Sequence, residues 1–362
     1  MNQINFEKEI VKVFQSTNNS YKYYWWYSIL QLVKEKKRKT LKLDEIAIQM
    51  IVFSWYPINY YKLSLGKQDQ LSIHISHLKN CFDELKDDIK EDELILFLNR
   101  NKEEIIVKEI LTKLSRYVPF RFIRPWFDET FGIKDGIVHQ QILSLQSSKT
   151  HLTPYFIDLT NNEIKLNSTW LDWIYSNIKI IESFTLFELF KYVEKNNPYV
   201  TNISLKLFKP QLRKLSEPTK LWKNFIEIKG AETKSVFEKK PLISLDNFAI
   251  DHYLPWSLVT HDKLWNLHPI EQEVNSSKSN KIAEKKYLIE FTSLQYYFVQ
   301  HVSKLNPKYL EDYFTLFSIS KMELLNISNI KFTELLNKKI TIETELATNL
   351  GYYTNWSYLN QD

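Results

Sequence analysis

Residues 251–281 read DHYLPWSLVTHDKLWNLHPIEQEVNSSKSNK and differ in character from the rest of the chain. Asp251 and His252 follow an apolar, strand-like segment and precede Pro255. Asn266 comes fourteen residues after His252, inside a second short apolar segment, and Asn275 follows nine residues later. Asn275 opens NSSKSNK, which is typical of the start of a helix. The order strand, loop, strand, helix predicts a small α+β module.

The segments on either side of this module predict mainly helices. Apolar spacing indicates helices over residues 5–14, 20–34, 44–65 with a break near Pro57, 185–197 ending before Pro198, and the tail from 291 onward. Three other segments read differently. A short hairpin is expected around Asn161 and Asn162, a turn-rich basic and aromatic stretch over 116–127, and a linker over 228–243.

Length and composition set the fold class. A chain of 362 residues exceeds one ordinary core and suggests two or three domains. Only five residues are glycine, which favours helices over sandwiches and barrels. We therefore expect a mainly α protein with three parts. Residues 1–235 form a helical domain that binds substrate or a partner, residues 244–290 form the α+β module, and residues 291–362 form a helical segment packing on the rest.

Charge and cysteine content narrow the setting. The net charge of +5 is mildly basic, so any nucleic-acid contact requires locally focused charge. Cys81 is the single cysteine, which excludes an internal disulfide framework. The first residues lack an apolar signal core, and no long apolar run occurs, so no membrane partner is expected. A reduced, cytoplasmic location is the resulting expectation.

Two basic stretches could contact phosphates. The first is KEKKRK at residues 34–39, and the second runs through residues 206–223 with six basic side chains: Lys206, Lys209, Arg213, Lys214, Lys220 and Lys223. Charge runs are more often solvated faces, and lysine stems often cover a helical core. For both stretches the structural interpretation is favoured, and phosphate binding stays an alternative.

The 251–281 stretch resembles the HNH endonuclease, or ββα-metal, motif. DHYLP resembles the first strand of that family, WNL its central Asn-Leu, and VNSSKSNK the helix that bears its third polar residue. The two spacings are also similar to those of HNH domains in CRISPR effector nucleases. The resemblance covers about forty residues and implies a ββα-metal fold for the module. Position 275 is Asn where many family members have His, so Asp and Asn oxygens favour Mg²⁺ or Mn²⁺ over Zn²⁺ or Ni²⁺.

Roles follow from the resemblance and from phosphodiester chemistry. Histidine suits proton removal near neutral pH, so His252 is expected to be the general base on water. Asp251 points away from His252 on an extended strand and, with Asn275, would bind Mg²⁺ or Mn²⁺. The resemblance implies that Asn266 ties the loop to the strand and orients His252.

Other polar residues of the stretch receive secondary roles. Lys278 lies one turn after Asn275 and, with Lys281, is expected to contact nucleic-acid phosphates. Asn280 is an alternate metal ligand. His261 and Asp262 are interpreted as a brace of the loop, and His268 as a structural residue.

The sequence thus predicts a metal-dependent DNA endonuclease. Its organisation resembles that of effectors of bacterial anti-phage defence or restriction systems, which a protein partner or activator would control. RNA remains an alternative substrate, because the motif contacts the phosphates of a nucleic acid and does not distinguish ribose from deoxyribose. The alternative from another class is a non-catalytic nucleic-acid-binding or scaffold protein with a degenerate HNH module. Salt-dependent binding without a metal-dependent product would distinguish that protein from an enzyme.

Overall fold

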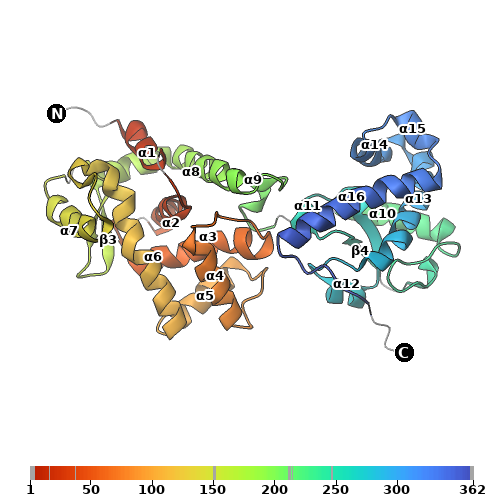
Figure 1. The fold of residues 1–362 in the computed structure, drawn as a ribbon, viewed down its shortest axis with the longest axis horizontal. Coiled ribbons are helices and arrows are strands. Elements are labelled where there is room, and N and C mark those ends of the chain that lie inside the picture. The colour runs from red at the N-terminus through yellow and green to blue at the C-terminus, as the bar shows by residue number, and fades with distance from the viewer. Residues whose placement is uncertain are drawn as a thin grey trace. The chain divides into compact units, whose positions relative to one another are not determined.

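The computed structural model describes residues 5–15, 17–36, 38–149, 152–210, 213, 215–245 and 248–358. The chain divides into two compact units, Met1–Lys209 and Pro210–Asp362. Figure 1 shows the elements of each unit. Both are mostly helical, and each contains one small antiparallel sheet, as the predicted fold class requires. Within the described residues, none of the helices combines the length and the apolar character needed to cross a membrane.

The first unit consists of nine described α-helices and a three-stranded sheet. The helices are α1 (Phe6–Phe14), α2 (Tyr21–Lys36), α3 (Leu43–Trp55), α4 (Gln70–Cys81), α5 (Glu91–Arg100), α6 (Ile105–Ile123), α7 (Asp135–Leu145), α8 (Ser168–Asn196) and α9 (Ile203–Lys206). The strands are β1 (Thr40–Lys42), β2 (Tyr155–Asp158) and β3 (Glu163–Leu166). The helix α3 passes into one π-helical turn, Tyr56–Tyr60, where the sequence predicts a break at Pro57.

Helix α2 is the centre of the first unit's core. It packs against both α3 and α8, and its Trp25 and Trp26 are fully buried. The Trp26 ring stacks on Phe122 with centroids 5.1 Å apart. The Trp25 indole donates to the Tyr155 hydroxyl at 3.0 Å, which in turn donates to the Pro119 carbonyl at 2.7 Å. Aromatic burial explains why a run of five aromatic residues, 23–27, is compatible with one helix.

The turn-rich stretch predicted over residues 116–127 is wrong for most of its length. Helix α6 continues through Pro119 to Ile123, and a 3₁₀ turn, Arg124–Trp126, follows. Phe120, Phe122 and Trp126 are buried. Proline lacks the backbone N–H of a regular helix, but tertiary packing around these aromatic side chains outweighs the lost hydrogen bond. The aromatic residues therefore fill the core.

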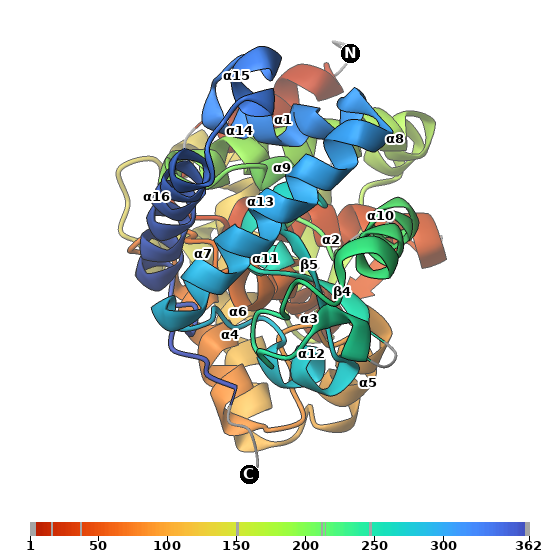
Figure 2. The ribbon, with the colours of Figure 1, turned by 90° about the vertical axis from the view of Figure 1, so that its right-hand side faces the viewer.

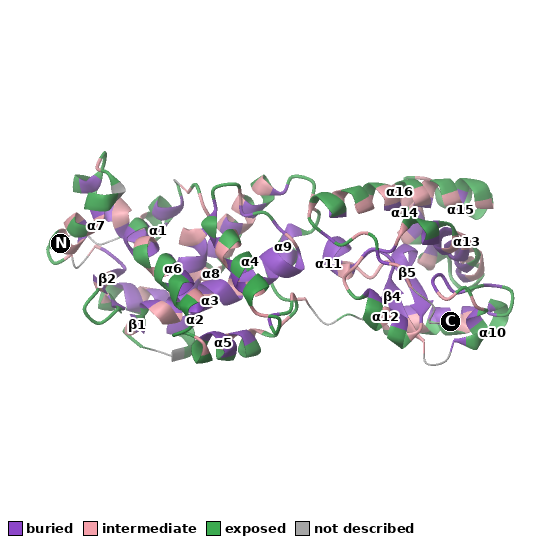
Figure 3. Cartoon of the chain, turned by 60° about the horizontal axis from the view of Figure 1, so that its bottom comes forward, coloured by how far each residue is buried: buried purple, intermediate pink, exposed green. Residues whose placement is uncertain are grey.

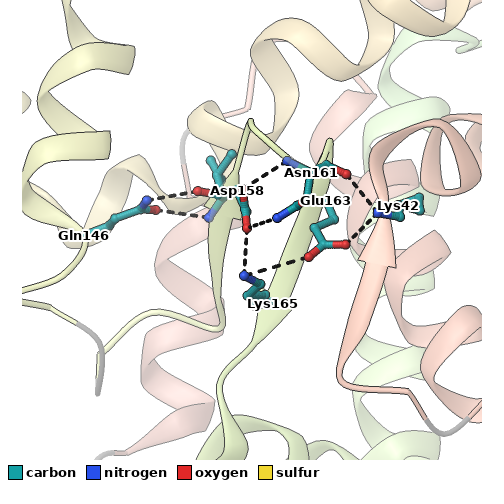
Figure 4. A network of polar contacts seen from close by, with 7 residues as sticks. Lys42, Gln146, Asp158, Asn161, Glu163 and Lys165 are labelled. Carbon is teal, nitrogen blue, oxygen red and sulfur yellow. Dashed lines mark hydrogen bonds and ion pairs between the residues drawn. The ribbon is translucent and has the colours of Figure 1, made fainter.

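The hairpin predicted around Asn161 and Asn162 is confirmed. Strands β2 and β3 pair antiparallel, β1 pairs with the other edge of β3, and Asn162 has a φ of 50° at the turn. Figure 4 shows the polar network over this sheet. Lys42 donates to Glu163 at 2.8 Å, and Lys165 donates to Asp158 at 2.7 Å. These cross-strand ion pairs fix the register of three short strands.

The second unit contains the strands β4 (Ala249–His252) and β5 (Leu267–Ile270), which form a two-stranded antiparallel sheet. Its helices are α10 (Ser216–Lys229), α11 (Trp256–Val259), α12 (Gln272–Lys278), α13 (Leu288–Leu305), α14 (Glu311–Phe317), α15 (Lys321–Leu325) and α16 (Asn329–Asn349). The order β4, β5, α12 agrees with the strand, strand, helix order predicted from the sequence. Figure 2 gives a second view of these elements.

One hydrophobic core runs through the whole second unit. It includes Trp222 on α10, Leu267 on β5, Phe291 on α13 and Leu336 on α16. Figure 3 shows that β4 and β5 are largely buried, whereas α16 has a strongly exposed side. The two short strands have too little surface to form a core alone. They depend on helices from both sides of the sequence.

The unit boundary differs from the domain boundaries predicted at 235/244 and 290/291. Helix α10 contacts both β4 and β5, so residues before 235 pack with the α+β module. The linker predicted over 228–243 is wrong, because this segment is folded. Lys234 and Pro241 form a β-bridge, and Val236, Phe237 and Leu242 lie in the core.

Candidate active site

The pairing of β4 with β5 sets which side chains share a face. Asp251 lies opposite His268, and His252 lies opposite Leu267. Neighbouring side chains on a strand point to opposite faces, so Asp251 and His252 point apart while remaining adjacent in the backbone. Asp251, His252 and His268 are all buried. The strand therefore presents a carboxylate on one side and an imidazole on the other.

Asn266 fixes the turn that follows β4. Its Oδ1 accepts from the Leu254 backbone N–H at 2.9 Å, and its Nδ2 donates to the Leu254 carbonyl at 2.9 Å. The Tyr253 backbone N–H also donates to the Asn266 carbonyl at 2.8 Å. Asn266 is fully buried, so these hydrogen bonds do not compete with solvent. Such a double clamp holds the backbone immediately after His252 in one conformation.

The His252 ring is held by a carboxylate from the loop before β5. Its Nε2 lies 2.9 Å from Asp262 Oδ1, while the ring is 1% exposed and Asp262 is partly exposed. Within the described part of the chain, His252 Nδ1 has no hydrogen-bond partner and is shielded from solvent. If Nε2–H donates to Asp262, Nδ1 carries the lone pair. This contact thus favours the tautomer in which Nδ1 can accept a proton.

The loop that carries Asp262 is anchored from α14. Asp312 accepts from the Leu264 backbone N–H at 3.0 Å through Oδ2, and from Lys263 Nζ at 3.1 Å through Oδ1. Asp312 lies in the first turn of α14. The residue before it in the sequence, Glu311, is exposed. An element far from the α+β module in sequence therefore fixes the loop on which Asp262 stands.

Asp251 forms a buried ion pair with Lys278. Lys278 Nζ donates to Asp251 Oδ2 at 2.8 Å and to the His252 carbonyl at 2.7 Å. The Lys278 side chain is fully buried. A lone buried charge is very costly, so each of these groups requires the other. The sequence expectation for Lys278 was a phosphate contact, but the structure places its amine against Asp251 and away from solvent.

Burial and neighbouring charges shift the pKa values on this face in opposite directions. Burial alone raises the pKa of Asp251, but the charge and the hydrogen bond of the nearby Lys278 ammonium act against burial, and the pKa lies below its usual range. Burial lowers the pKa of His268 to about 4. The His268 ring lies edge-on to Phe237 and Phe291, with centroids 5.3 Å and 5.5 Å away. We therefore assign Asp251 as ionised and His268 as neutral at neutral pH.

The remaining predicted residues lie on or after α12. Asn275 is half-buried, and no hydrogen bond joins its side chain to another described residue. The Asn280 Oδ1 accepts from the Ser257 hydroxyl at 2.5 Å, so that oxygen already has a partner. Lys281 is partly exposed and donates to the Ser277 carbonyl at 2.9 Å. Of the two predicted phosphate-binding lysines, Lys281 is the more accessible.

The donor set near Asp251 suits a hard divalent cation. Asp251 Oδ1 accepts no hydrogen bond from another described residue, and Asn275 offers an amide oxygen from α12, which contacts β4. Carboxylate and amide oxygens are ligands that Mg²⁺ accepts, with water completing its shell. Across the described ranges, no cluster of three or more His, Cys, Asp or Glu side chains converges on one point. The residues therefore fit a water-rich Mg²⁺ or Mn²⁺ site better than an all-protein zinc site.

The sequence missed the contact of His252 with Asp262 and the pairing of Lys278 with Asp251. Asp262 was interpreted only as part of a loop brace, and no periodic pattern connects it with His252, which lies ten positions earlier in the sequence. Lys278 does carry a signal. It follows Val274 by four positions, so both lie on one helix face, and Val274 is buried.

Comparison with known families agrees with this geometry. Residues 233–284 match the family model of HNH endonucleases. No curated protein and no solved structure shows significant similarity to the chain. The match spans β4, β5 and α12 and therefore contains the whole set from Asp251 to Lys281. It also begins before the module boundary predicted at residue 244.

Proposed function

Because residues 233–284 carry an HNH endonuclease domain, we propose that this protein is a metal-dependent endonuclease that hydrolyses phosphodiester bonds of DNA. One observation supports the proposal above the others. His252 is held through Nε2 by Asp262, and its Nδ1 has no partner among the described residues. It stands beside a carboxylate, Asp251, that faces the other way. A base and a cation-binding acid are thus adjacent without competing for one another.

In this proposal His252 Nδ1 takes the proton from the water that attacks phosphorus. Asp262 holds the Nε2–H and stabilises the imidazolium that forms, as a positioned carboxylate does in other histidine-based hydrolases. Asn266 does not react; its two hydrogen bonds to Leu254 keep the strand end in place. His252 Nδ1 is shielded from solvent in this structure. The proposed mechanism therefore requires the residues around the imidazole ring to move enough for a water molecule to reach Nδ1.

Asp251 and Asn275 would hold Mg²⁺ or Mn²⁺. When bound, such an ion neutralises charge on the phosphate and stabilises the leaving 3′ oxygen. Lys278 balances the buried Asp251 charge and donates to the His252 carbonyl, so it also supports the strand. Lys281, which is partly exposed, is the better candidate for a phosphate contact.

The first unit lies outside the family match, and we propose that it binds substrate, a protein partner or an activator. A nuclease domain joined to a large helical unit resembles effectors of bacterial anti-phage defence or restriction systems. An effector of that kind has to be held inactive in its host cell. Rapid cleavage of host DNA by the isolated chain would argue against such control.

One observation favours a second candidate, a non-catalytic nucleic-acid-binding protein with a degenerate HNH module. The Lys278 ammonium occupies Asp251 Oδ2, an oxygen that an active site would offer to a metal ion. In that case the module would be the folded remnant of a nuclease, and the ion pair between Lys278 and Asp251 would stand where an active enzyme binds its metal ion. The four expected positions, Asp251, His252, Asn266 and Asn275, are nevertheless all retained.

A cleavage assay separates these candidates. Purified full-length protein and its His252→Ala variant are incubated with supercoiled plasmid, single-stranded DNA and RNA, in Mg²⁺, Mn²⁺ or EDTA. We expect metal-dependent nicking of DNA that falls at least about 1,000-fold in the variant. His77→Ala is the control, because His77 is an exposed histidine on α4 in the first unit, outside the proposed set.

The outcomes are distinct. A folded His252→Ala protein that cuts as fast as wild type would falsify the assignment. Cleavage of RNA alone would change the substrate and keep the mechanism. Salt-dependent binding without any product, together with unchanged Mg²⁺ affinity in Asp251→Ala, would favour the non-catalytic candidate.

A further inference from the structure

The first unit contains a bipartite pocket that the proposed nuclease chemistry does not use. Its narrower part has a volume of about 330 Å³ and lies between the start of α2, α4 and α6. Its wider part has a volume of about 880 Å³ and opens beside the turn at Arg124. The two parts share four lining residues: Asn18, Asn19, Lys22 and Arg121. A pocket of this size accommodates a small-molecule ligand.

The wider part is strongly basic. Lys12, Lys22, Arg121 and Arg124 line it, against one acidic residue, Asp128. Burial, together with the smaller effect of the charges of Arg124 and Arg121, lowers the pKa of Lys22 to about 8. Like charges gathered around a partly buried amine destabilise one another. A bound anion would relieve that repulsion, so the wall is suited to phosphate groups.

The narrower part differs in character. Aromatic side chains from two helices, Tyr21 and Tyr117, line it together with His74 and Val118. Arg121 connects the two parts, because its guanidinium lies over the Tyr117 ring at 5.3 Å while it also lines the basic part. Lys113 adds a second cation at the edge, and Glu109 pairs with it. Flat walls with polar edges suit a planar heterocycle.

We propose that this pocket binds a small phosphorylated nucleoside, with the base in the narrower part and the phosphates against Lys22, Arg121 and Arg124. A buried acid at the start of α4, Asp69, does not oppose this arrangement. Asp69 accepts from the Ser20 and Leu71 backbone N–H groups, which hold its charge inside the protein. The proposal is independent of catalysis at His252, since every residue it uses belongs to the first unit.

Titration calorimetry on the full-length protein in EDTA tests the proposal. The probes are ATP, AMP, inorganic pyrophosphate, adenosine and a single-stranded deoxyoligonucleotide. We expect ATP to bind with a Kd below about 100 µM and pyrophosphate to bind at least about tenfold more weakly. Adenosine should bind more weakly than AMP, because it lacks the phosphate that meets the basic wall.

Two variants and one control locate the site. Arg121→Gln and Lys22→Gln should each weaken ATP binding at least about tenfold. Arg116→Gln is the matched control. Arg116 is also exposed on α6 and also lies over Tyr117, at 5.1 Å, yet it does not line the pocket. ATP affinity in this control should stay within about twofold of wild type. Arg121 is exposed, so its replacement leaves the fold intact even if Lys22→Gln does not fold.

Several results would overturn the proposal. Absence of ATP binding up to about 5 mM would remove the ligand class. If Arg116→Gln lost as much ATP affinity as Arg121→Gln, the binding would be due to general surface charge and not to the pocket. Equal affinity for ATP and pyrophosphate would exclude a base subsite. Oligonucleotide binding that depends on Arg121, with no ATP binding, would make the pocket wall a nucleic-acid backbone surface.

Discussion

The contact between His252 and Asp262 decides which ring nitrogen is left to take a proton. A neutral imidazole has one donor and one acceptor nitrogen, and a carboxylate can only accept. Asp262 therefore fixes the proton on Nε2 and leaves the lone pair on the shielded Nδ1. An amide at position 262 could instead donate to Nε2 and move the ring proton to Nδ1, where it would block base catalysis.

Asp262→Asn is therefore expected to lower kcat for DNA cleavage about 100-fold while KM stays within about twofold. In the proposed mechanism Asp262 acts through His252 as a positioning residue, so substrate affinity should be preserved. Steady-state cleavage of a fluorescent duplex measures both constants. Glu273→Gln, which removes an exposed carboxylate from α12, serves as the control. An unchanged kcat in folded Asp262→Asn protein would show that the tautomer is set elsewhere.

His268 gives the second unit a predictable dependence on pH. Its folded pKa of about 4 lies below the unfolded value near 6.5. Between these values the unfolded chain binds a proton that the folded chain does not, so stability rises with pH up to about 6.5 and falls toward pH 4. Between pH 7 and pH 5 the loss from this one residue is about 2 kcal/mol.

His268→Leu should remove that part of the pH dependence. Leucine suits the aromatic surroundings formed by Phe237 and Phe291. The free energy of unfolding of the variant should therefore fall by about 2 kcal/mol less than that of wild type between pH 7 and pH 5. Urea unfolding in EDTA measures both values. His77→Leu, on an exposed helix face, should behave as wild type. Parallel pH profiles for His268→Leu and wild type would contradict the assignment of a neutral buried histidine.

At the scale of elements, the site depends on a helix that the HNH match does not include. Helix α14 holds the loop of residues 262–264 through Asp312, outside residues 233–284. Helix α13 supports β5 in a similar way. Its buried Gln295 donates to the Leu267 carbonyl at 2.6 Å and accepts from the Tyr313 hydroxyl at 2.7 Å. The two strands are thus positioned by helices that follow them in the chain.

Asp312→Ala should loosen the Asp262 loop without altering the strands. We expect kcat to fall about tenfold and the free energy of unfolding to fall by about 1 kcal/mol, since a backbone hydrogen bond and a partly exposed ion pair are lost. Glu311→Ala changes the neighbouring exposed residue of the same helix and should leave both quantities unchanged. If both variants cut DNA at the wild-type rate, α14 has no part in positioning Asp262.

The sequence predicted the elements that depend on the spacing of nearby residues. It did not predict the features that depend on contacts between residues far apart in the chain. The strands β4 and β5 and the helix α12 could be predicted from local sequence. The spacing of four polar residues and the apolar segments around them indicates these elements: Asp251, His252, Asn266 and Asn275. The turn-rich stretch predicted over residues 116–127 is wrong because contacts with Trp26 and Tyr155 hold the helix in place. Asp312 lies 50 residues beyond Asp262, so no local pattern joins them. Tertiary contacts of this kind are set by packing and not by propensity.

At the scale of the whole molecule, the nuclease module cannot be separated from its surroundings by the limits of the family match. The core of the second unit extends from Leu221 to Trp356. The last described residues also join the module, because Ile282 and Glu284 form backbone hydrogen bonds with Tyr353 and Trp356. A fragment of about fifty residues would leave most of this apolar surface exposed to water. The folding unit is therefore predicted to be the complete second unit.

Residues 210–362 expressed alone should fold, unfold in one cooperative transition, and retain metal-dependent plasmid cleavage within about tenfold of the full chain. A fragment of residues 233–290 should be unfolded, because it lacks α10, α13 and α16 and with them most of the shared core. Circular dichroism during urea titration and the plasmid assay test both fragments. A folded, active 233–290 fragment would show that the flanking helices are dispensable. Loss of cleavage in a folded 210–362 fragment would instead assign the first unit a direct part in binding the substrate.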